Sequence, residues 1–303
     1  MDVESKPSVS ILMINKNHGH YLTKTIKSYL SQTWANLDII VVDGGSIDNS
    51  VDILKKFTKV KVYSEKDSSG SEAYIKCLNL CKSELVMFAT SNDLLVDIDF
   101  IERAVALFVR NRDLSCVFGK VLNLLENDSP GDVVYPHNLI NHFGEPRQNF
   151  KNWLINSDSF HECAALFNKN AVLTSLGDLG RYSLPLNQLK IDLFLELRYG
   201  FFSNGFKAKF IDANVVAIRN HLDRVSVESR PHFLRHLNYY SEQISDFRIN
   251  FIRKHNYNFI SPYNDKKDPL GVLDSSIFSL LIIRHLIFVH FKSSVKKLLH
   301  YKS

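Results

Sequence analysis

Residues 39–48 read IIVVDGGSID, and this stretch decides which fold the chain can build. Four apolar residues favour a buried strand, and Asp43 then presents a carboxylate at the carboxyl edge of a sheet. The two glycines that follow allow a tight turn in which a ligand can lie close to the backbone. Ser46 or Asp48 is placed to cap the next helix, whose N–H groups favour nearby negative charge. This order of residues predicts a nucleotide site.

The composition is that of a globular protein with a sizeable core. The chain has 303 residues, of which 45% are hydrophobic and 23% charged, so we expect one large domain or one domain with appendages. The formal charge of +5 is mild and no basic run resembles a nucleic-acid-binding arm, so nucleic acid is not an expected partner. Residues 1–7 lack the basic-then-apolar order of a signal peptide. Reduced, partly buried thiols are expected at Cys77, Cys81, Cys116 and Cys163.

Strand and helix patterns alternate along the first 110 residues. Strands are expected at 9–14, 39–42, 60–63 and 85–89, and helices at 21–32, 50–57, 72–81 and 99–110. This alternation predicts a mostly parallel sheet with ligands bound beyond the carboxyl ends of its strands. A polar residue suited to ligand binding follows each expected strand: Asn15, Asp43, Asp67 and Asp93.

Two later segments have a different character. Residues 123–158 are polar and broken by proline and glycine, so we expect a long loop region near the site. Residues 275–303 carry two apolar runs separated by Arg284 and His285, with no acid after Asp274. A spanning helix needs about 20 apolar residues, so we expect a basic helix that lies in a membrane surface. A terminal helix docked on the protein's own core is the alternative.

Specific motifs surround the central stretch. Val9-Ser10-Ile11-Leu12, Asn17, Tyr21-Leu22 and Gln32-Thr33 precede it, and Ser64-Glu65-Lys66-Asp67, Ala73, Lys76, Phe88 and Asp93 follow it. Together these residues resemble the family 2 glycosyltransferases, which have the GT-A fold. A looser similarity to the acceptor half of bacterial members includes His161, Phe167, Gly177 and Asp192-Leu193. The resemblance covers roughly residues 8–200.

The resemblance implies a fold and a domain organisation. The fold would be α/β of the GT-A type, a Rossmann-like, mostly parallel sheet with helices on both faces and a C-terminal helical extension. We expect a catalytic domain over residues 1–225, with a nucleotide-sugar-binding half (8–120) and an acceptor half (121–225). Residues 226–303 would form the extension, which is the part expected to meet the membrane.

The resemblance also implies a donor site. Asp43 falls where the family binds the base of a nucleotide sugar, and a carboxylate can accept the imide N–H of uracil. Lys76 would approach the diphosphate, and a solvated surface lysine is its alternative. Asn15 and Asn17 would line the nucleotide, and either could instead be a turn residue. The whole expected site comprises Asn15, Asn17, Asp43, Gly44, Gly45, Asp67, Lys76, Asn92 and Asp93.

The expected metal site departs from the family pattern. Members usually carry Asp-x-Asp or Asp-Asp after the fourth strand, whereas this chain reads Thr90-Ser91-Asn92-Asp93. One carboxylate plus phosphate oxygens can hold a hard cation, so Asp93 is expected to bind Mn²⁺ or Mg²⁺. A helix cap is the alternative role for Asp93. His221 is a second candidate ligand, with an ordinary surface histidine as its alternative.

The position of the catalytic base also departs from the family pattern. Inverting transfer needs a carboxylate that takes the proton of the acceptor hydroxyl. In the looser similarity to the acceptor half of bacterial family members, Lys190 stands where many members have this base. The nearest acid is Asp192. We therefore expect Asp192 to be the base, with Glu162 and Asp178 in reserve. A structural acid is the alternative role for Asp192.

The expected function is transfer of a sugar from a nucleoside-diphosphate sugar, UDP-linked, to a hydroxyl of a growing, lipid-linked bacterial surface glycan. Trp153 and His161 are expected at the acceptor site of this glycan or glycolipid, and Trp34 is expected to serve packing. The protein would be cytoplasmic and peripheral on the inner face of the bacterial membrane. The alternative is a non-catalytic sugar-nucleotide-binding or scaffold subunit, because Asn92 and Lys190 replace acids. A nucleotidyltransferase is disfavoured, since no glycine-rich basic loop lies near the N-terminus.

Overall fold

The computed structural model of the chain describes residues 6–125, 127–135, 160–177 and 193–219, together with residues 146, 149 and 179. The chain divides into two compact units. One comprises residues 1–143, 159–201 and 206–220, and the other comprises 144–158, 202–205 and 221–303. The strands and helices that position the candidate site belong to the first unit.

Strands and helices alternate in the first part of the chain, as the sequence predicts. In chain order they are β1 (Val9–Asn15), α1 (Gly19–Leu30), β2 (Leu37–Asp43), α2 (Ser50–Leu54), β3 (Val60–Ser64), α3 (Gly70–Leu80), β4 (Leu85–Thr90) and α4 (Phe100–Arg110). The helix expected over 50–57 is shorter than predicted, since α2 ends at Leu54. A two-residue strand, β5 (Leu94–Leu95), lies between β4 and α4 and was not predicted.

Nine strands form one sheet within the described part of the chain, in the order β3-β2-β1-β4-β8-β6-β9-β5 with β7 paired to β6. The strands after α4 are β6 (Leu114–Leu124), β7 (Pro130–Tyr135), β8 (Ala165–Asn168) and β9 (Lys207–Arg219). β1, β2, β3 and β4 are mutually parallel, with Asn15 beside Asp43 and Ile14 beside Thr90. The carboxyl ends of these four strands therefore lie on one edge of the sheet. The mostly parallel α/β architecture is as expected.

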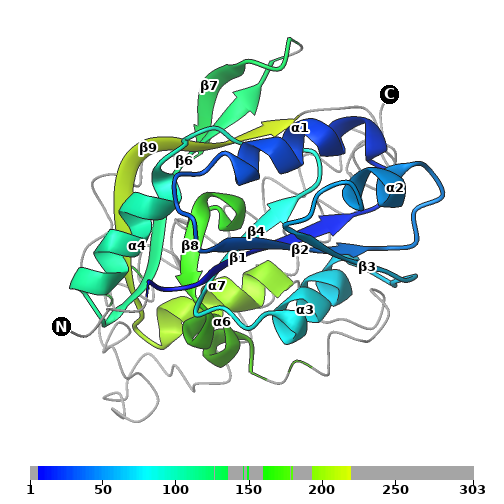
Figure 1. Ribbon diagram of the computed structural model, residues 1–303. Coiled ribbons are helices and arrows are strands. Elements are labelled where there is room, and N and C mark those ends of the chain that lie inside the picture. The colour runs from blue at the N-terminus through cyan, green and yellow to red at the C-terminus, as the bar shows by residue number, and fades with distance from the viewer. Residues whose placement is uncertain are drawn as a thin grey trace, which may run out of the picture. The chain divides into compact units, whose positions relative to one another are not determined.

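Helices cover both faces of the sheet, and alternating side chains of the strands pack against them. Ile11 and Met13 of β1 are fully buried in a core shared with Ile26 of α1 and with α4. Phe88 of β4 packs edge-on against Tyr74 of α3, with ring centroids 5.3 Å apart. Figure 1 accordingly shows α1 and α2 on one side of β1, β2 and β3, and α3 on the other. Because both faces are covered, the ends of the strands are the parts of the parallel sheet left for a ligand.

The second part of the unit corrects the expected loop. After α4 come β6 (Leu114–Leu124), β7 (Pro130–Tyr135), the 3₁₀ turn η2 (Glu162–Ala164), β8 (Ala165–Asn168), α6 (Lys169–Leu176), α7 (Leu193–Ser203) and β9 (Lys207–Arg219). The predicted loop over 123–158 is wrong for its first part, because β6 and β7 pair as an antiparallel hairpin. This hairpin projects from the sheet in Figure 1. Its tip lies at Asp128, which has a positive φ of 62°.

Two other expectations bear on compartment and membrane. All four cysteines are unbridged, as predicted, and they are buried rather than partly buried. Among the helices that the structure describes, none is long and apolar enough to cross a membrane. The predicted extension over 226–303, with its basic segment 275–303, lies outside the described residues.

Candidate functional site

Asp43 organises the carboxyl edge of the sheet. Its side chain is fully buried at the end of β2, and each carboxylate oxygen accepts two hydrogen bonds. Asn15 Nδ2 donates to Oδ1 at 2.6 Å, and Ser64 Oγ donates to Oδ2 at 2.8 Å. Ser46 donates twice, from its hydroxyl to Oδ1 and from its backbone N–H to Oδ2 at 2.9 Å. The carboxylate thus ties the ends of β1, β2 and β3 to the turn that follows.

Hydrogen bonding sets the charge state of Asp43. Burial alone would raise the pKa of this carboxyl group, but the bonds from Ser46, Ser64 and Asn15 outweigh it. The pKa of Asp43 is therefore lowered from its ordinary value. The group is a carboxylate at neutral pH, with its lone pairs already directed at protein donors.

The sequence offered Ser46 or Asp48 as the cap of the helix after β2. Ser46 does not cap α2, because its hydroxyl bonds Asp43 and accepts the N–H of Asn17 at 2.8 Å. Asn17 in turn accepts the N–H of Ile47 at 2.8 Å, and its positive φ of 55° marks a turn residue. Asp48 accepts the N–H of Ser50 at 3.0 Å and that of Gly19 at 2.9 Å, the first residues of α2 and α1, whose N-caps are Asn49 and His18.

The two glycines of the turn have separate roles. Gly45 has a positive φ of 75°, a conformation that side-chain-bearing residues rarely adopt. Gly44 is packed against Asp67, since a Cβ at this position would lie 2.7 Å from Asp67 Oδ2. The absence of a side chain at position 44 thus lets the Asp67 carboxylate reach the end of β2.

Asp67 carries an unfavourable charge in the folded protein. Burial raises its pKa, and the carboxylates of Glu72 and Asp43 add to the rise, although Lys16 and Lys76 oppose it. Lys76 projects from α3, whose start is capped by Ser69 Oγ accepting the N–H of Glu72 at 3.2 Å. The ammonium lies 3.0 Å from Glu65 and 3.2 Å from Glu72. Lys76 is therefore a half-buried, paired lysine rather than the fully solvated one that the alternative interpretation expected.

Asn92 and Asp93 lie directly after β4, and both are buried. Thr90 Oγ1 donates to Asp93 Oδ2 at 2.5 Å, and the backbone N–H of Arg219 donates to Oδ1 at 3.0 Å. The alternative role of Asp93 as a helix cap is wrong, because β5 follows it and Asp99 is the N-cap of α4. The carboxylate is held instead between β4 and the end of β9.

Arg219 is a site residue that sequence reasoning missed. Its guanidinium lies over the ring of Tyr21, 4.4 Å from the centroid, and its Nε lies 3.4 Å from the carbonyl oxygen of Asn92. It also pairs with Asp128 at the tip of the β6–β7 hairpin, which binds Lys24 of α1 as well. The signal in the sequence was its position, since it ends an apolar strand that runs to the same edge as Asp93. Partners as distant as Asp128 follow from tertiary structure alone.

The profile of "Glycosyl transferase family 2" matches residues 10–173, which is more than half of the chain. This chain belongs to glycosyl transferase family 2. The matched residues include Asp43, Asp67 and Asp93, the carboxylates gathered at the carboxyl edge. Membership in the family is as the sequence resemblance predicted.

Curated relatives of this family 2 protein come from several bacteria. The glycosyltransferase GlyG of Streptococcus pneumoniae is 30% identical over 125 residues, 40% of this chain and 41% of the relative. The putative teichuronic acid biosynthesis glycosyltransferase TuaG of Bacillus subtilis is 32% identical over 93 residues, 29% of this chain and 37% of the relative. The similarity thus spans less than half the length of these relatives.

Solved structures show the fold of the family 2 chain to be GT-A. The mannosyltransferase PcManGT of Pyrobaculum calidifontis, in complex with GDP-Man and Mn²⁺, superposes with a TM-score of 0.55 at 14% identity, covering 95% of this chain and 74% of the neighbour. Residues 1–349 of S. aureus TarS, in complex with UDP-GlcNAc, superpose with a TM-score of 0.53 at 13% identity, covering 78% and 66% of the two chains. The predicted fold class is confirmed.

His161 and Glu162 of the family 2 chain lie just before β8, at the start of η2. His161 is half-buried and its Nδ1 accepts the N–H of Cys163 at 3.3 Å, which caps η2. Glu162 is buried and lies 2.5 Å from the guanidinium of Arg198 on α7. A carboxylate that a guanidinium engages must give up this contact before it can take the proton of an acceptor hydroxyl. The reserve role of Glu162 as catalytic base is therefore not favoured by its surroundings.

Several expected site residues lie outside the described part of the chain. These are the candidate base Asp192 with its neighbour Lys190, the reserve acid Asp178, the acceptor candidate Trp153 and the metal candidate His221. Within the described residues, no group of three or more His, Cys, Asp and Glu side chains could hold a metal ion. Asp93 nevertheless fits a cation that takes one protein carboxylate and completes its shell with phosphate oxygens and water.

Proposed function

We propose that this family 2 protein is an inverting glycosyltransferase that uses a nucleoside-diphosphate sugar as its donor. The observation that carries the proposal is the gathering of Asp43, Asp67 and Asp93 at one edge of a GT-A sheet, each at or just after the end of a different strand. Ligands of open α/β sheets bind at this edge. The neighbours that bind UDP-GlcNAc and GDP-Man share the fold, which supports a donor of the same class here.

We assign the two ends of the donor to different residues. Asp43, Asn15 and the turn at Gly44 and Gly45 would hold the nucleoside, and a UDP donor suits a carboxylate that accepts the imide N–H of uracil. Because the Asp43 oxygens already accept four hydrogen bonds, a Ser46 or Ser64 hydroxyl would have to rotate away to admit the base. Asp67 lies beside this turn, where the ribose would pass, and Asn17, from the β1–α1 connection, is hydrogen-bonded to the same turn.

Asp93 would hold Mn²⁺ or Mg²⁺ at the diphosphate end of the donor, with Asn92 and Lys76 nearby in the proposed site. When bound, such a cation neutralises the charge that develops on the leaving diphosphate. The protein's own part is to fix the Asp93 carboxylate, which the Thr90 hydroxyl and the Arg219 N–H both hold. His221 remains a proposed second ligand, since it follows Arg219 by two residues along the chain.

The transfer step itself needs one base. The oxygen of an acceptor hydroxyl attacks the anomeric carbon, the bond from that carbon to the diphosphate breaks, and the base takes the hydroxyl proton. We propose Asp192 as this base, because the ion pair with Arg198 occupies Glu162. His161 and Trp153 are proposed for the acceptor, a hydroxyl of a growing, lipid-linked bacterial surface glycan.

Nucleotide release tests the proposal. The full-length protein is incubated with UDP-GlcNAc, UDP-glucose, UDP-galactose or GDP-mannose and Mn²⁺ or Mg²⁺, with and without a lipid-linked glycan acceptor. We expect acceptor-dependent release of nucleotide from one donor, and a loss of release on substitution Asp192→Asn without loss of donor binding. Donor binding with no release from any donor and acceptor would support the second candidate, a sugar-nucleotide-binding subunit, which the Asn92 position favours.

We also propose that residues 275–303 attach the protein to an anionic membrane surface on the cytoplasmic side. Support comes from the sequence, in which Arg284 and several lysines accompany the apolar runs while acids are absent. Removal of residues 275–303 should abolish sedimentation with vesicles that contain phosphatidylglycerol. Unchanged sedimentation of the truncated protein would refute this role.

Asp67→Asn is expected to stabilise the free protein and to weaken donor binding. The raised pKa of Asp67 means that folding disfavours its charged form, a penalty that is present above the folded pKa and absent below the unfolded value of about 3.9. At pH 7 the free energy of unfolding should therefore rise, by at most about 1 kcal/mol for this partly exposed group.

Urea unfolding at pH 7 and at pH 3.5 measures the effect, and titration with UDP-GlcNAc or GDP-mannose measures binding. The variant Asp52→Asn, which removes an exposed acid from α2, is the control and should show no rise in stability. A variant at Asp67 that is less stable than wild type at pH 7 would contradict the electrostatic interpretation.

A further inference from the structure

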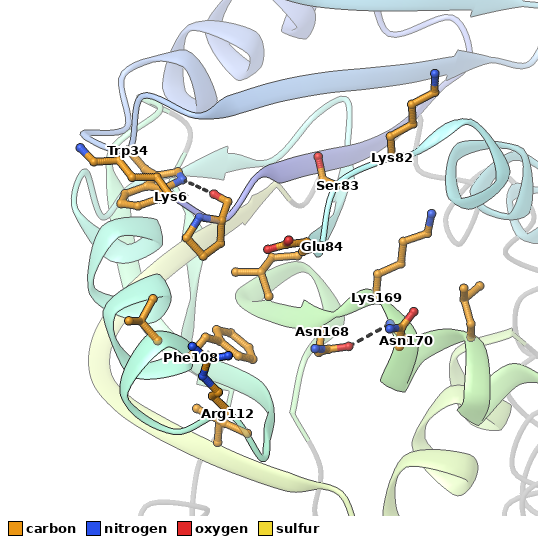
Figure 2. Close-up of a pocket in the computed structure, with 15 residues that line it drawn as sticks. Lys6, Trp34, Lys82, Ser83, Glu84, Phe108, Arg112, Asn168, Lys169 and Asn170 are labelled. Carbon is orange, nitrogen blue, oxygen red and sulfur yellow. Dashed lines mark hydrogen bonds between the residues drawn. The ribbon is translucent and has the colours of Figure 1, made fainter. Parts of the chain in front are cut away.

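A cavity of about 840 Å³ opens at the edge of the sheet opposite the carboxylates. Its lining comes from the segment before β1, the α3–β4 connection, the α4–β6 connection and the junction of β8 with α6 (Figure 2). These segments meet because β1, β4 and β6 run in the same direction while β8 is antiparallel to its two neighbours. The seven residues of β1 separate this edge from Asn15 and Asp43 by roughly 20 Å. The proposed donor site therefore leaves the cavity unused.

The walls of the cavity carry an excess of positive charge. Four cations line it, Lys6, Lys82, Arg112 and Lys169, against one acid, Glu84. Each cation comes from a different segment of the chain, so the excess is not a local run of basic sequence. Lys6, Lys82 and Arg112 are exposed, and the ammonium of the half-buried Lys169 donates to the Cys81 carbonyl. Like charges gathered around a concave surface focus a positive potential into it.

Trp34 positions Lys6 at the mouth of the cavity. The indole N–H of Trp34 donates to the carbonyl oxygen of Pro7 at 3.2 Å, and the Lys6 ammonium lies 5.9 Å from the centroid of the Trp34 ring. Figure 2 shows Lys6 and Trp34 on one side of the cavity and Lys82 and Lys169 on the other. The space between them is bounded by the buried apolar side chains of Leu85, Phe108 and Leu114. A ligand bridging the two sides would meet cations at both ends.

We propose that this cavity is a second binding site, for an oligosaccharide that bears carboxylate or phosphate groups. The identification of the ligand as a glycan rests on the proposed function, whereas its negative charge follows from the four cations. The volume suits a ligand of a few sugar rings. The Asn170 amide, the NH₂ of Asn168, whose oxygen caps α6, and the apolar base can meet the hydroxyls and ring faces of sugars between the charged groups. A planar membrane surface cannot enter a concave site, which favours a glycan chain over lipid headgroups.

The position of the site gives it a distinct role. An anionic glycan held there lies away from the carboxyl edge, so its charged groups take no part in the chemistry of transfer. The cavity would retain a charged glycan on the protein between successive encounters of that glycan with the donor site. Its affinity for the chain should weaken with added salt, because exposed ion pairs are screened.

The double variant Lys82→Gln/Arg112→Gln tests the proposal, and Lys55→Gln/Lys56→Gln, which removes two exposed lysines just after α2, is the matched control. Calorimetry without donor measures binding of an oligosaccharide of alternating glucuronate and N-acetylglucosamine, with neutral dextran and sugar-free polyphosphate as comparisons. We expect the cavity variant to bind the oligosaccharide about tenfold more weakly. The control variant should bind it as wild type does, and dextran should not bind.

Equal oligosaccharide affinity in the cavity and control variants would overturn the proposal. Polyphosphate or phosphatidylglycerol vesicles that bind through Lys82 and Arg112 while the oligosaccharide does not would overturn the glycan assignment. If the double variant unfolds, Lys6→Gln, an exposed residue before β1, replaces it with the same expected direction. Because no donor is present, a negative result here is distinguishable from a failure of the proposed transferase activity.

Discussion

Replacing Asp93 by asparagine is expected to lower acceptor-dependent nucleotide release at least about a hundredfold, since a bound cation supplies several kcal/mol of transition-state stabilisation. Asp93 is the first acid after β4, and the sequence resemblance implies a second acid at the position of Asn92. The amide could accept a hydrogen bond from Thr90 or Arg219 through one oxygen, and its NH₂ would oppose the other donor.

Two variants separate loss of charge from loss of local structure at Asp93. Thr90→Ala removes the hydroxyl that donates to Oδ2 but keeps the carboxylate, so release should fall by less than tenfold. Asn92→Asp restores a second carboxylate and should lower the Mn²⁺ concentration needed for half-maximal release. Release is measured across a Mn²⁺ titration at saturating donor, with the melting temperature of each variant recorded. Wild-type release by Asp93→Asn would remove this residue from the proposed metal site.

Asp43→Asn is expected to weaken donor binding roughly a hundredfold and to destabilise the fold by about 2 kcal/mol, because hydrogen bonds to a buried charged group are worth about 1.5–3 kcal/mol. Four donors from Asn15, Ser46 and Ser64 converge on the carboxylate. An amide NH₂ in the same place would face one pair of these donors. The turn at Gly44 and Gly45 would then lose the contact that fixes it to β1 and β3.

The same substitution should change the response of stability to acid. The pKa of Asp43 is lowered in the folded state, so its carboxylate contributes stability above the unfolded value of about 3.9. That contribution is lost as the pH falls through the lower, folded pKa. Below about pH 4 wild type should therefore lose stability more steeply than the Asp43→Asn variant. Acid unfolding followed by circular dichroism measures this difference.

Two control variants accompany Asp43→Asn. One changes another residue of β2, and the other removes a hydrogen-bond donor to Asp43. Asp38→Asn removes a carboxylate at the other end of β2, where it pairs with Lys61, and should leave donor binding unchanged. Ser64→Ala removes one donor to Asp43 Oδ2 and should preserve or improve binding if the base N–H takes its place. Equal donor affinity in wild type and the Asp43→Asn variant would refute the assignment of this residue to the nucleoside.

Sequence reasoning failed where distant segments decide the outcome. Ser46 or Asp48 was expected to cap the helix after β2, but the buried Asp43 carboxylate takes the Ser46 hydroxyl, and Asp48 accepts the N–H of Ser50 while Asn49 is the N-cap of α2. The segment beginning at residue 123 was expected to be a loop because it is polar, yet β6 and β7 pair there and bring Asp128 to Arg219. Local propensity cannot reveal such pairings, since the stabilising partners are remote in the chain.

The sequence by itself determined the alternation of strands and helices, the family, and the order of polar residues that follow the strands. These features are local, because apolar period and turn residues are written into short stretches such as residues 39–48. Only the tertiary structure decided that Asp43 is saturated by four donors, that Gly44 admits Asp67, and that Arg219 reaches Asp93. It also gathered the four cations at the opposite edge of the sheet. Parallel strands align ends that lie far apart in sequence, so the contents of each edge follow from strand order and direction.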